Sequence, residues 1–80
     1  MKILVRKLSR STTEHDIRAL FAEHGFVQEC TLVLDQASGL SKGFAFVEMP
    51  NEKEAEKAVK VLNETELDKK KIRVKNADNN

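Results

Sequence analysis

The segment KGFAFVEM begins at Lys42 and alternates in a way that predicts an extended strand. If Ala45 and Val47 pack inward, the residues between them must face outward, because successive strand side chains point to opposite faces. The outward residues are then Phe44 and Phe46, with Lys42 on the same side. The chain has only four phenylalanines and no other aromatic residue. An aromatic patch rimmed by charge marks a binding surface.

Catalytic and metal-binding chemistry finds little support among the side chains. The single cysteine, Cys30, stands at no metal-site spacing from His15 or His24. There is no GxxxxGK phosphate loop, and the outward face has no paired carboxylates and no histidine beside a nucleophile. We therefore expect a protein that is not an enzyme and that holds neither a metal nor a cofactor. Cys30 is expected to be a small buried hydrophobic residue.

Length and composition indicate one small folded domain. The chain has 80 residues, of which 40% are hydrophobic and 34% charged, as in folded globular proteins. We expect the domain to span residues 1–77, followed by a short tail at 78–80. The sequence contains neither a run of about 18 apolar residues nor a signal-peptide core. We therefore expect no membrane contact and a cytoplasmic location. Because the first strand begins directly after Met1 and the last strand ends near the last residue, we also expect a stand-alone monomeric protein, with a domain excised from a longer protein as the alternative.

Charge is segregated along the chain although the formal net charge is only +1. Residues 1–10 and 69–75 carry only basic charges, whereas acidic residues outnumber basic ones in the stretch 11–67. The basic groups of the two ends are Lys2, Arg6, Lys7, Arg10, Lys69, Lys70, Lys71, Arg73 and Lys75. Such segregation produces a positive surface only if the two ends meet in space.

Two helices and four strands are predicted. Thr13 begins the first helix with Asp16 in the capping-box position, and Gly25 ends it. Asn51 begins the second helix with Glu54 in the same relation. The strands are predicted at residues 2–8, 27–34, 42–49 and 70–75.

The order strand, helix, strand, strand, helix, strand predicts an α+β, ferredoxin-like βαββαβ sandwich. Right-handed crossovers give a four-stranded antiparallel sheet of order 4-1-3-2, with both helices on one face. The expected core consists of Ile3, Val5, Leu8, Ile17, Leu20, Phe21, Cys30, Leu32, Ala45, Val47, Met49, Ala55, Ala58, Val59, Leu62, Ile72 and Val74. The helix-free face is expected to carry Lys2, Leu4, Arg6, Thr31, Val33, Lys42, Phe44, Phe46, Glu48, Lys71, Arg73 and Lys75.

KGFAFVEM resembles the octamer of the RNA-recognition motif family, which it matches at every fixed position except the last. ILVRKL, residues 3–8, resembles the family's hexamer, and LFAEHG and DQASGLSKGF are also similar to family segments. The chain also resembles the small bacterial RNA-binding proteins that consist of a single motif. The resemblance implies that single-stranded RNA crosses the sheet and stacks its bases on the outward aromatic rings. The implied RNA-binding residues are Lys2, Leu4, Arg6, Val33, Lys42, Phe44, Phe46, Lys71, Arg73 and Lys75.

Several positions depart from the family pattern. Leu4 stands where the hexamer has an aromatic residue, so two stacking platforms remain; Lys7 replaces asparagine and adds attraction for phosphate without sequence discrimination. Glu64 and Lys69 stand where the family usually has glycine, which suggests that the connection 63–69 is built differently. Glu48 is unfavourable near phosphate and is expected to pair with Arg6 or Arg73.

Two alternatives accompany the implied function. Single-stranded DNA is a possible weaker ligand of the same face. The exposed aromatic face would also suit a protein-protein interaction module, and in that case the partner would be a protein.

Overall fold

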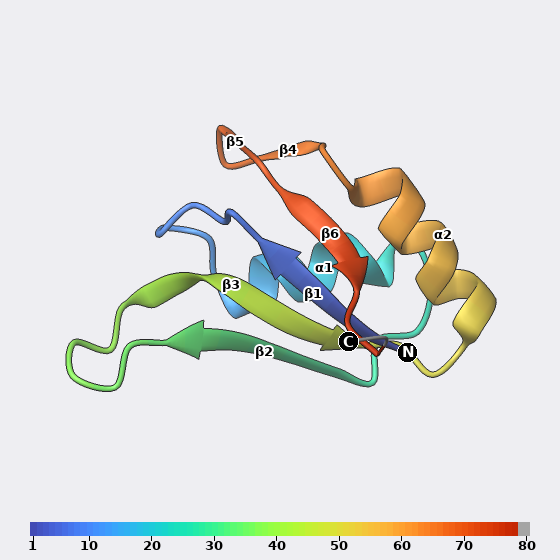
Figure 1. The fold of residues 1–80 in the computed structure, drawn as a ribbon, viewed down its shortest axis with the longest axis horizontal. Helices are drawn as coiled ribbons and strands as arrows, with labels where there is room; N and C mark the ends of the chain where they lie inside the picture. Colours follow the sequence, from blue (N-terminus) through green and yellow to red (C-terminus); the bar gives the residue numbers. More distant parts are fainter. Residues whose placement is uncertain (79–80) are drawn as a thin grey trace.

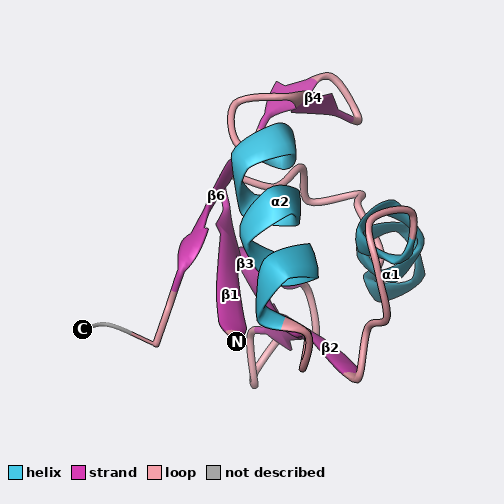
Figure 2. Cartoon of the chain, turned by 90° about the vertical axis from the view of Figure 1, so that its right-hand side faces the viewer, coloured by secondary structure: helices cyan, strands magenta, loops and turns pink. Residues whose placement is uncertain are grey.

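A computed structural model describes residues 1–78 and has the predicted element order. The four-stranded antiparallel sheet has the order β2-β3-β1-β6 (Figure 1). Since β6 is the last of the predicted strands, this arrangement confirms the predicted order. Both helices cover the same face of the sheet (Figure 2). The elements are β1 (Lys2–Arg6), α1 (Glu14–Ala22), β2 (Glu29–Leu34), β3 (Ser41–Glu48), α2 (Glu52–Leu62), β4 (Glu66–Leu67), β5 (Lys70–Lys71) and β6 (Arg73–Asn76).

Both helices begin at the predicted caps. In α1 the Thr13 side chain accepts from the Asp16 N–H at 3.1 Å, and the Asp16 carboxylate accepts from the Thr13 N–H at 3.0 Å. This exchange forms the predicted capping box, and its hydrogen bonds hold the pKa of Asp16 below its ordinary value. In α2 the Asn51 side chain accepts from the Glu54 N–H, but the Glu54 carboxylate accepts from the Phe26 N–H instead of completing a box.

The core lies between the sheet and the helices and largely has the predicted composition. The predicted residues Leu20, Leu32 and Val59 pack against it while only partly buried. Val27 is buried although it was not predicted to be. Cys30 is buried at 4% exposure, and this burial raises the pKa of its thiol. The cysteine is therefore an uncharged core residue at neutral pH, as expected.

The last predicted strand, residues 70–75, is in fact divided into two parts. Lys70 and Lys71 form β5, which pairs only with β4, whereas β6 pairs with β1. The backbone of Ile72, between them, bonds to Glu64 and Thr65 and not to β1. Lys71 therefore lies in a two-stranded ribbon and not on the sheet face. The predicted position of Lys71 on the helix-free face was wrong.

The ribbon turns through two residues in the left-handed backbone region. Asp68 has φ 51° and Lys69 has φ 67°, and Leu67 pairs directly with Lys70. Positive φ at both central residues of a two-residue loop is typical of a type I′ hairpin turn, which favours glycine or asparagine. Glu64 is also left-handed, at φ 66°. The backbone thus adopts a glycine-like conformation at Glu64 and Lys69, the two positions where the family usually has glycine.

The end of the described chain is tied to the start of β1. The Ala77 N–H donates to the Lys2 carbonyl at 2.8 Å, and the Asp78 carboxylate accepts from the Lys2 N–H at 3.2 Å. Beyond Asp78, the expected tail lies outside the described residues.

Replacing Lys69 by glycine is expected to stabilise the fold by about 0.5–1 kcal/mol. A left-handed conformation costs an L-residue roughly 1–2 kcal/mol, and glycine avoids this cost. Glycine also has more conformational freedom in the unfolded chain, which lowers the stability of the fold and offsets part of the improvement. Equilibrium denaturation would measure the change. Lys71→Gly is the matched control, because Lys71 is not among the residues with positive φ and glycine weakens a strand. A lower stability for Lys69→Gly would contradict the account of the turn.

Candidate nucleic-acid interface

The register of the sheet places the predicted site residues side by side on its helix-free face. Leu4, on the central strand β1, lies opposite Phe46 of β3 and opposite Lys75 of β6. Phe46 in turn lies opposite Thr31 of β2. Residues that are directly paired across a sheet share a face. These four side chains therefore form one row across all four strands.

The two outward phenylalanines contact each other edge to face. The ring centroids of Phe44 and Phe46 are 6.1 Å apart and the ring planes are at 88°. Both rings are partly exposed, and neither belongs to the buried core. The Lys2 ammonium lies 4.8 Å from the Phe46 ring centroid, in a cation-π contact. The Lys2 ammonium therefore lies over one face of the Phe46 ring, and a base that stacks on that face would have to displace it.

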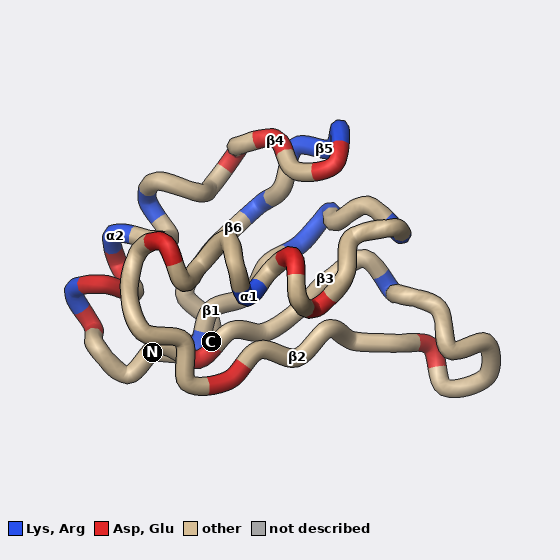
Figure 3. The backbone as a smooth tube through the Cα atoms, turned by 180° about the vertical axis from the view of Figure 1, so that it is seen from behind, with Lys and Arg blue, Asp and Glu red and all other residues tan. Residues whose placement is uncertain are grey.

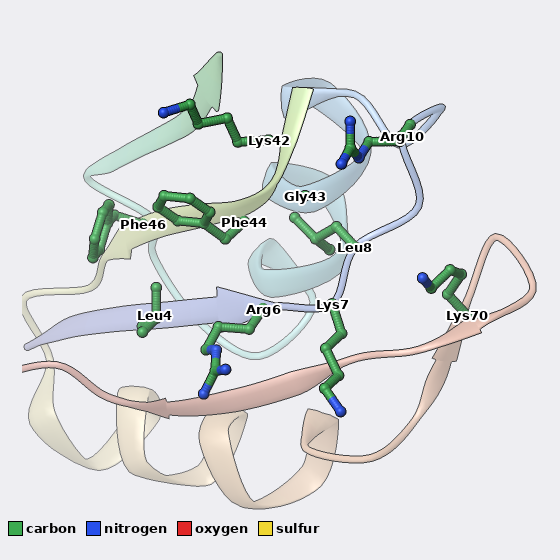
Figure 4. A pocket seen from close by; sticks show the side chains of 10 residues that line it. All are labelled: Leu4, Arg6, Lys7, Leu8, Arg10, Lys42, Gly43, Phe44, Phe46 and Lys70. Carbon is green, nitrogen blue, oxygen red and sulfur yellow. The ribbon is translucent and has the colours of Figure 1, made fainter. Parts of the chain in front are cut away.

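A depression of about 480 Å³ opens beside these rings (Figure 4). Its lining brings the predicted site residues together with basic residues from two other segments. One segment is the connection from β1 to α1, and the other is the ribbon β4–β5. Among residues 1–78 no carboxylate contributes to the lining, which in this range consists of Leu4, Arg6, Lys7, Leu8, Arg10, Lys42, Gly43, Phe44, Phe46 and Lys70.

A smaller depression of about 260 Å³ lies over the other side of β1. It is lined by Arg6, Lys7, Asn63, Arg73, Val74 and Lys75. Arg6 and Lys7 line both depressions, so the basic groups of β1 and β6 continue from one depression to the other. Figure 3 shows the basic positions of these paired strands close together, whereas α2 carries both signs of charge. The two basic ends of the chain therefore meet in space and form one positive surface, which was the condition that the charge pattern left open.

Comparison with known proteins assigns the family. A family model for the RNA recognition motif matches residues 3–73. The chain belongs to the RNA recognition motif family. It is 43% identical to human Transformer-2 protein homolog beta over 84% of this chain and 23% of that protein. It is 36% identical to Glycine-rich RNA-binding protein 1 of Mycosarcoma maydis over 96% of this chain and 44% of that protein. The chain therefore spans less than half the length of these curated relatives.

Solved structures of this family have the same fold. The crystal structure of RNA Binding Protein PG1 matches all of this chain and 96% of that chain, with a TM-score of 0.95 and 34% identity. The Sxl-lethal protein/RNA complex matches 95% of this chain and 46% of that chain, with a TM-score of 0.91 and 32% identity. The Rna15 RRM with bound RNA (GU) matches 98% of this chain and 83% of that chain, with a TM-score of 0.87 and 26% identity.

The glycine of the RNA recognition motif octamer has a physical reason in this chain. Gly43 has φ 86°, a conformation that other residues rarely adopt. Its carbonyl accepts from the Leu8 N–H at 2.8 Å, and a Cβ on Gly43 would lie 3.4 Å from the Leu8 carbonyl oxygen. The same Cβ would lie 3.8 Å from Arg10 Nε. Both distances are ordinary van der Waals contacts, so the left-handed backbone conformation, and not a lack of space, is what favours glycine at this position.

Neither depression is lined by Val33, Lys71 or Glu48, which the sequence placed on the helix-free face of the RNA recognition motif. Val33 lies on β2 at an irregularity in the pairing with β3, is partly buried and lines neither depression. Lys71 lies on the ribbon, as described above. The Glu48 carboxylate lies 3.1 Å from the Met1 amino group, and within residues 1–78 it pairs with neither Arg6 nor Arg73.

Sequence reasoning did not include Arg10 and Lys70 in the site. The available signal was the basic character of both chain ends, but only the fold brings the two residues to one depression. Within residues 1–78, no group of His, Cys, Asp or Glu side chains is arranged to hold a metal ion. None of the helices in this range is long and apolar enough to cross a membrane.

Proposed function

We propose that this domain binds single-stranded RNA across the helix-free sheet face, with bases on Phe44 and Phe46 and phosphates near the surrounding cations. The observation that carries the proposal is the pair of outward rings lining a depression rimmed by basic side chains. Aromatic rings on such a sheet stack bases, and lysine and arginine attract the phosphate backbone. The role of the domain is binding, without a catalysed reaction.

The relatives support RNA as the ligand. Two of the matching structures are described as RNA complexes, the Sxl-lethal protein/RNA complex and the Rna15 RRM with bound RNA (GU). A curated relative is named Glycine-rich RNA-binding protein 1. These descriptions concern those proteins, and shared family membership extends the ligand class to this chain.

The geometry of the rings favours a single strand over a duplex. Because the Phe44 and Phe46 planes are nearly perpendicular, two bases that stack on them cannot also stack on each other. The bases must therefore be splayed apart, as they are in single-stranded segments bound by proteins. Aromatic faces accept every base, so we expect loose sequence preference. DNA lacks the 2′-hydroxyl that can distinguish RNA, and single-stranded DNA is expected to bind more weakly.

Phe44→Ala and Phe46→Ala are each expected to weaken RNA binding by roughly 1–3 kcal/mol, the contribution of one stacked base. The fold should remain intact, because neither ring belongs to the buried core. Titration of a short single-stranded oligonucleotide would measure the loss. Phe26→Ala is the matched control, since Phe26 is 66% exposed and lines neither depression. If neither Phe44→Ala nor Phe46→Ala weakens binding, the sheet is not the RNA surface and the protein-interaction alternative takes its place.

Leu4→Phe is expected to strengthen RNA binding, because it adds an aromatic platform beside Phe46. Leu4 is partly exposed, lies opposite Phe46 and lines the larger depression, so the ring has room. The gain should approach the roughly 1–3 kcal/mol of one stacked base. The same titration measures it, with Val61→Phe on the exposed side of α2 as the control. Equal affinities for the parent and both variants would argue against stacking on β1.

Lys42→Ala is expected to act through charge. Its loss should reduce the slope of log affinity against log salt by about 0.7, the value for one phosphate contact on a single strand. Titrations at several salt concentrations would distinguish it from Phe44→Ala, which should weaken binding with little change in slope. Lys57→Ala removes the same charge from α2, on the other side of the sheet, and should leave the slope unchanged. An unchanged slope for Lys42→Ala would exclude a phosphate contact at this residue.

A further inference from the structure

We propose that the β1–α1 connection and the β4–β5 ribbon form a phosphate-binding cleft that extends the RNA path beyond the sheet. The cleft is the part of the larger depression bounded by Lys7, Arg10 and Lys70. Its ligand is the phosphodiester backbone of the strand whose bases lie on the rings. This inference rests on the proposed function and adds a site that does not depend on stacking.

Uncompensated charge is the first observation that points to an anion. Within residues 1–78, none of the basic side chains that line the depression forms an ion pair with a carboxylate. These side chains are Arg6, Lys7, Arg10, Lys42 and Lys70. Cations around one hollow repel each other, and an anion between them relieves that repulsion.

The two walls of the cleft are joined by a hydrogen bond between distant parts of the chain. The Thr12 hydroxyl donates to the Asp68 carboxylate at 2.6 Å, and Thr12 is only 2% exposed. Thr12 follows Arg10 closely in the β1–α1 connection, and Asp68 occupies the turn of the ribbon just before Lys70. The bond therefore ties the segment that carries Arg10 to the turn that precedes Lys70. It also engages the one acidic group of the turn, which does not line the depression.

The backbone conformation of Lys7 is a further observation that supports the cleft. Lys7 has φ 60° at the end of β1, although lysine has no particular preference for the left-handed region. Asparagine, aspartate and glycine occupy that region at lower cost. A costly backbone conformation at a residue that lines both depressions is consistent with selection for its charge and not for stability.

The cleft is continuous with the stacking face, which identifies RNA as its ligand. Leu4, Phe44 and Phe46 line the same depression as Lys7, Arg10 and Lys70 (Figure 4). A strand with bases on the rings therefore has its backbone directed toward these cations. An acidic peptide would satisfy the charge but would make no use of the adjacent rings.

The test compares Lys7→Asn, Lys70→Gln and the double variant with Lys60→Gln, a control on the exposed side of α2. Each protein is titrated over a range of salt with a trinucleotide and with an oligonucleotide of about eight residues, because the sheet holds only two or three bases. With the longer RNA, each cleft substitution should reduce the salt slope by about 0.7. With the trinucleotide, the slopes should match the parent. Lys7→Asn should also raise the melting temperature by about 2–4 °C, as its backbone cost falls.

The outcomes separate this inference from the proposed function. Salt slopes equal to those of Lys60→Gln with the longer RNA overturn the cleft, while a loss of affinity in Phe44→Ala would leave the sheet function standing. Loss of affinity in the cleft variants together with unchanged binding by Phe44→Ala supports the cleft and removes the stacking proposal. If the cleft substitutions reduce the salt slope only with a 5′-phosphorylated trinucleotide, the cleft binds a terminal phosphate, and the proposal that the RNA strand continues into it is wrong. Equal binding of an oligo-glutamate peptide, lost in the same variants, overturns the assignment to RNA.

Discussion

The pairing of β1 with both β3 and β6 is the constraint on which the rest of the proposed binding surface depends. A central strand brings residues from the start, the middle and the end of the chain into one row, in which Leu4 lies between Phe46 and Lys75. Shifting this register by one residue would turn the rings into the core and expose Ala45 and Val47. Burial of Ile3 and Val5 on the opposite face of β1 prevents such a shift. The core therefore determines the orientation of the rings.

Local patterns in the sequence were sufficient to predict both helices, the four strands of the main sheet and most of the sheet face. The period-two alternation around Phe44 identified the outward side of β3, and Thr13 and Asn51 identified the helix starts. Topology followed because right-handed crossovers allow few arrangements of these elements. The predicted burial was correct for residues such as Met49, because its place in the core follows from strand alternation and from the helices that cover that face of the sheet.

The ribbon was missed because its signal is not local. Lys70 to Lys75 alternates like a single strand, and the turn before it lacks the glycine or asparagine that identifies a type I′ hairpin. The division at Ile72 depends on its backbone bonds to Glu64 and Thr65, which only the packed structure provides. Similarly, Arg10 and Lys70 line one depression, and the Thr12–Asp68 hydrogen bond that joins their two segments spans 56 positions of the sequence. No pattern within a short window could have related these positions.

Neither part of the proposed surface is suited to distinguish one RNA sequence from another. Phenyl rings accept every base, and lysine and arginine that contact phosphates read no sequence, so neither part supplies strong discrimination. Hydrogen bonds to base edges would supply it. Among residues 1–78, however, the larger depression is lined by side-chain donors and by no side-chain acceptor, because neither a carboxylate nor an amide of this range lines it. Its side chains are therefore complementary to acceptors such as phosphate oxygens. If bases stack as proposed, selectivity comes mainly from the single-stranded form of the RNA, because perpendicular rings require splayed bases.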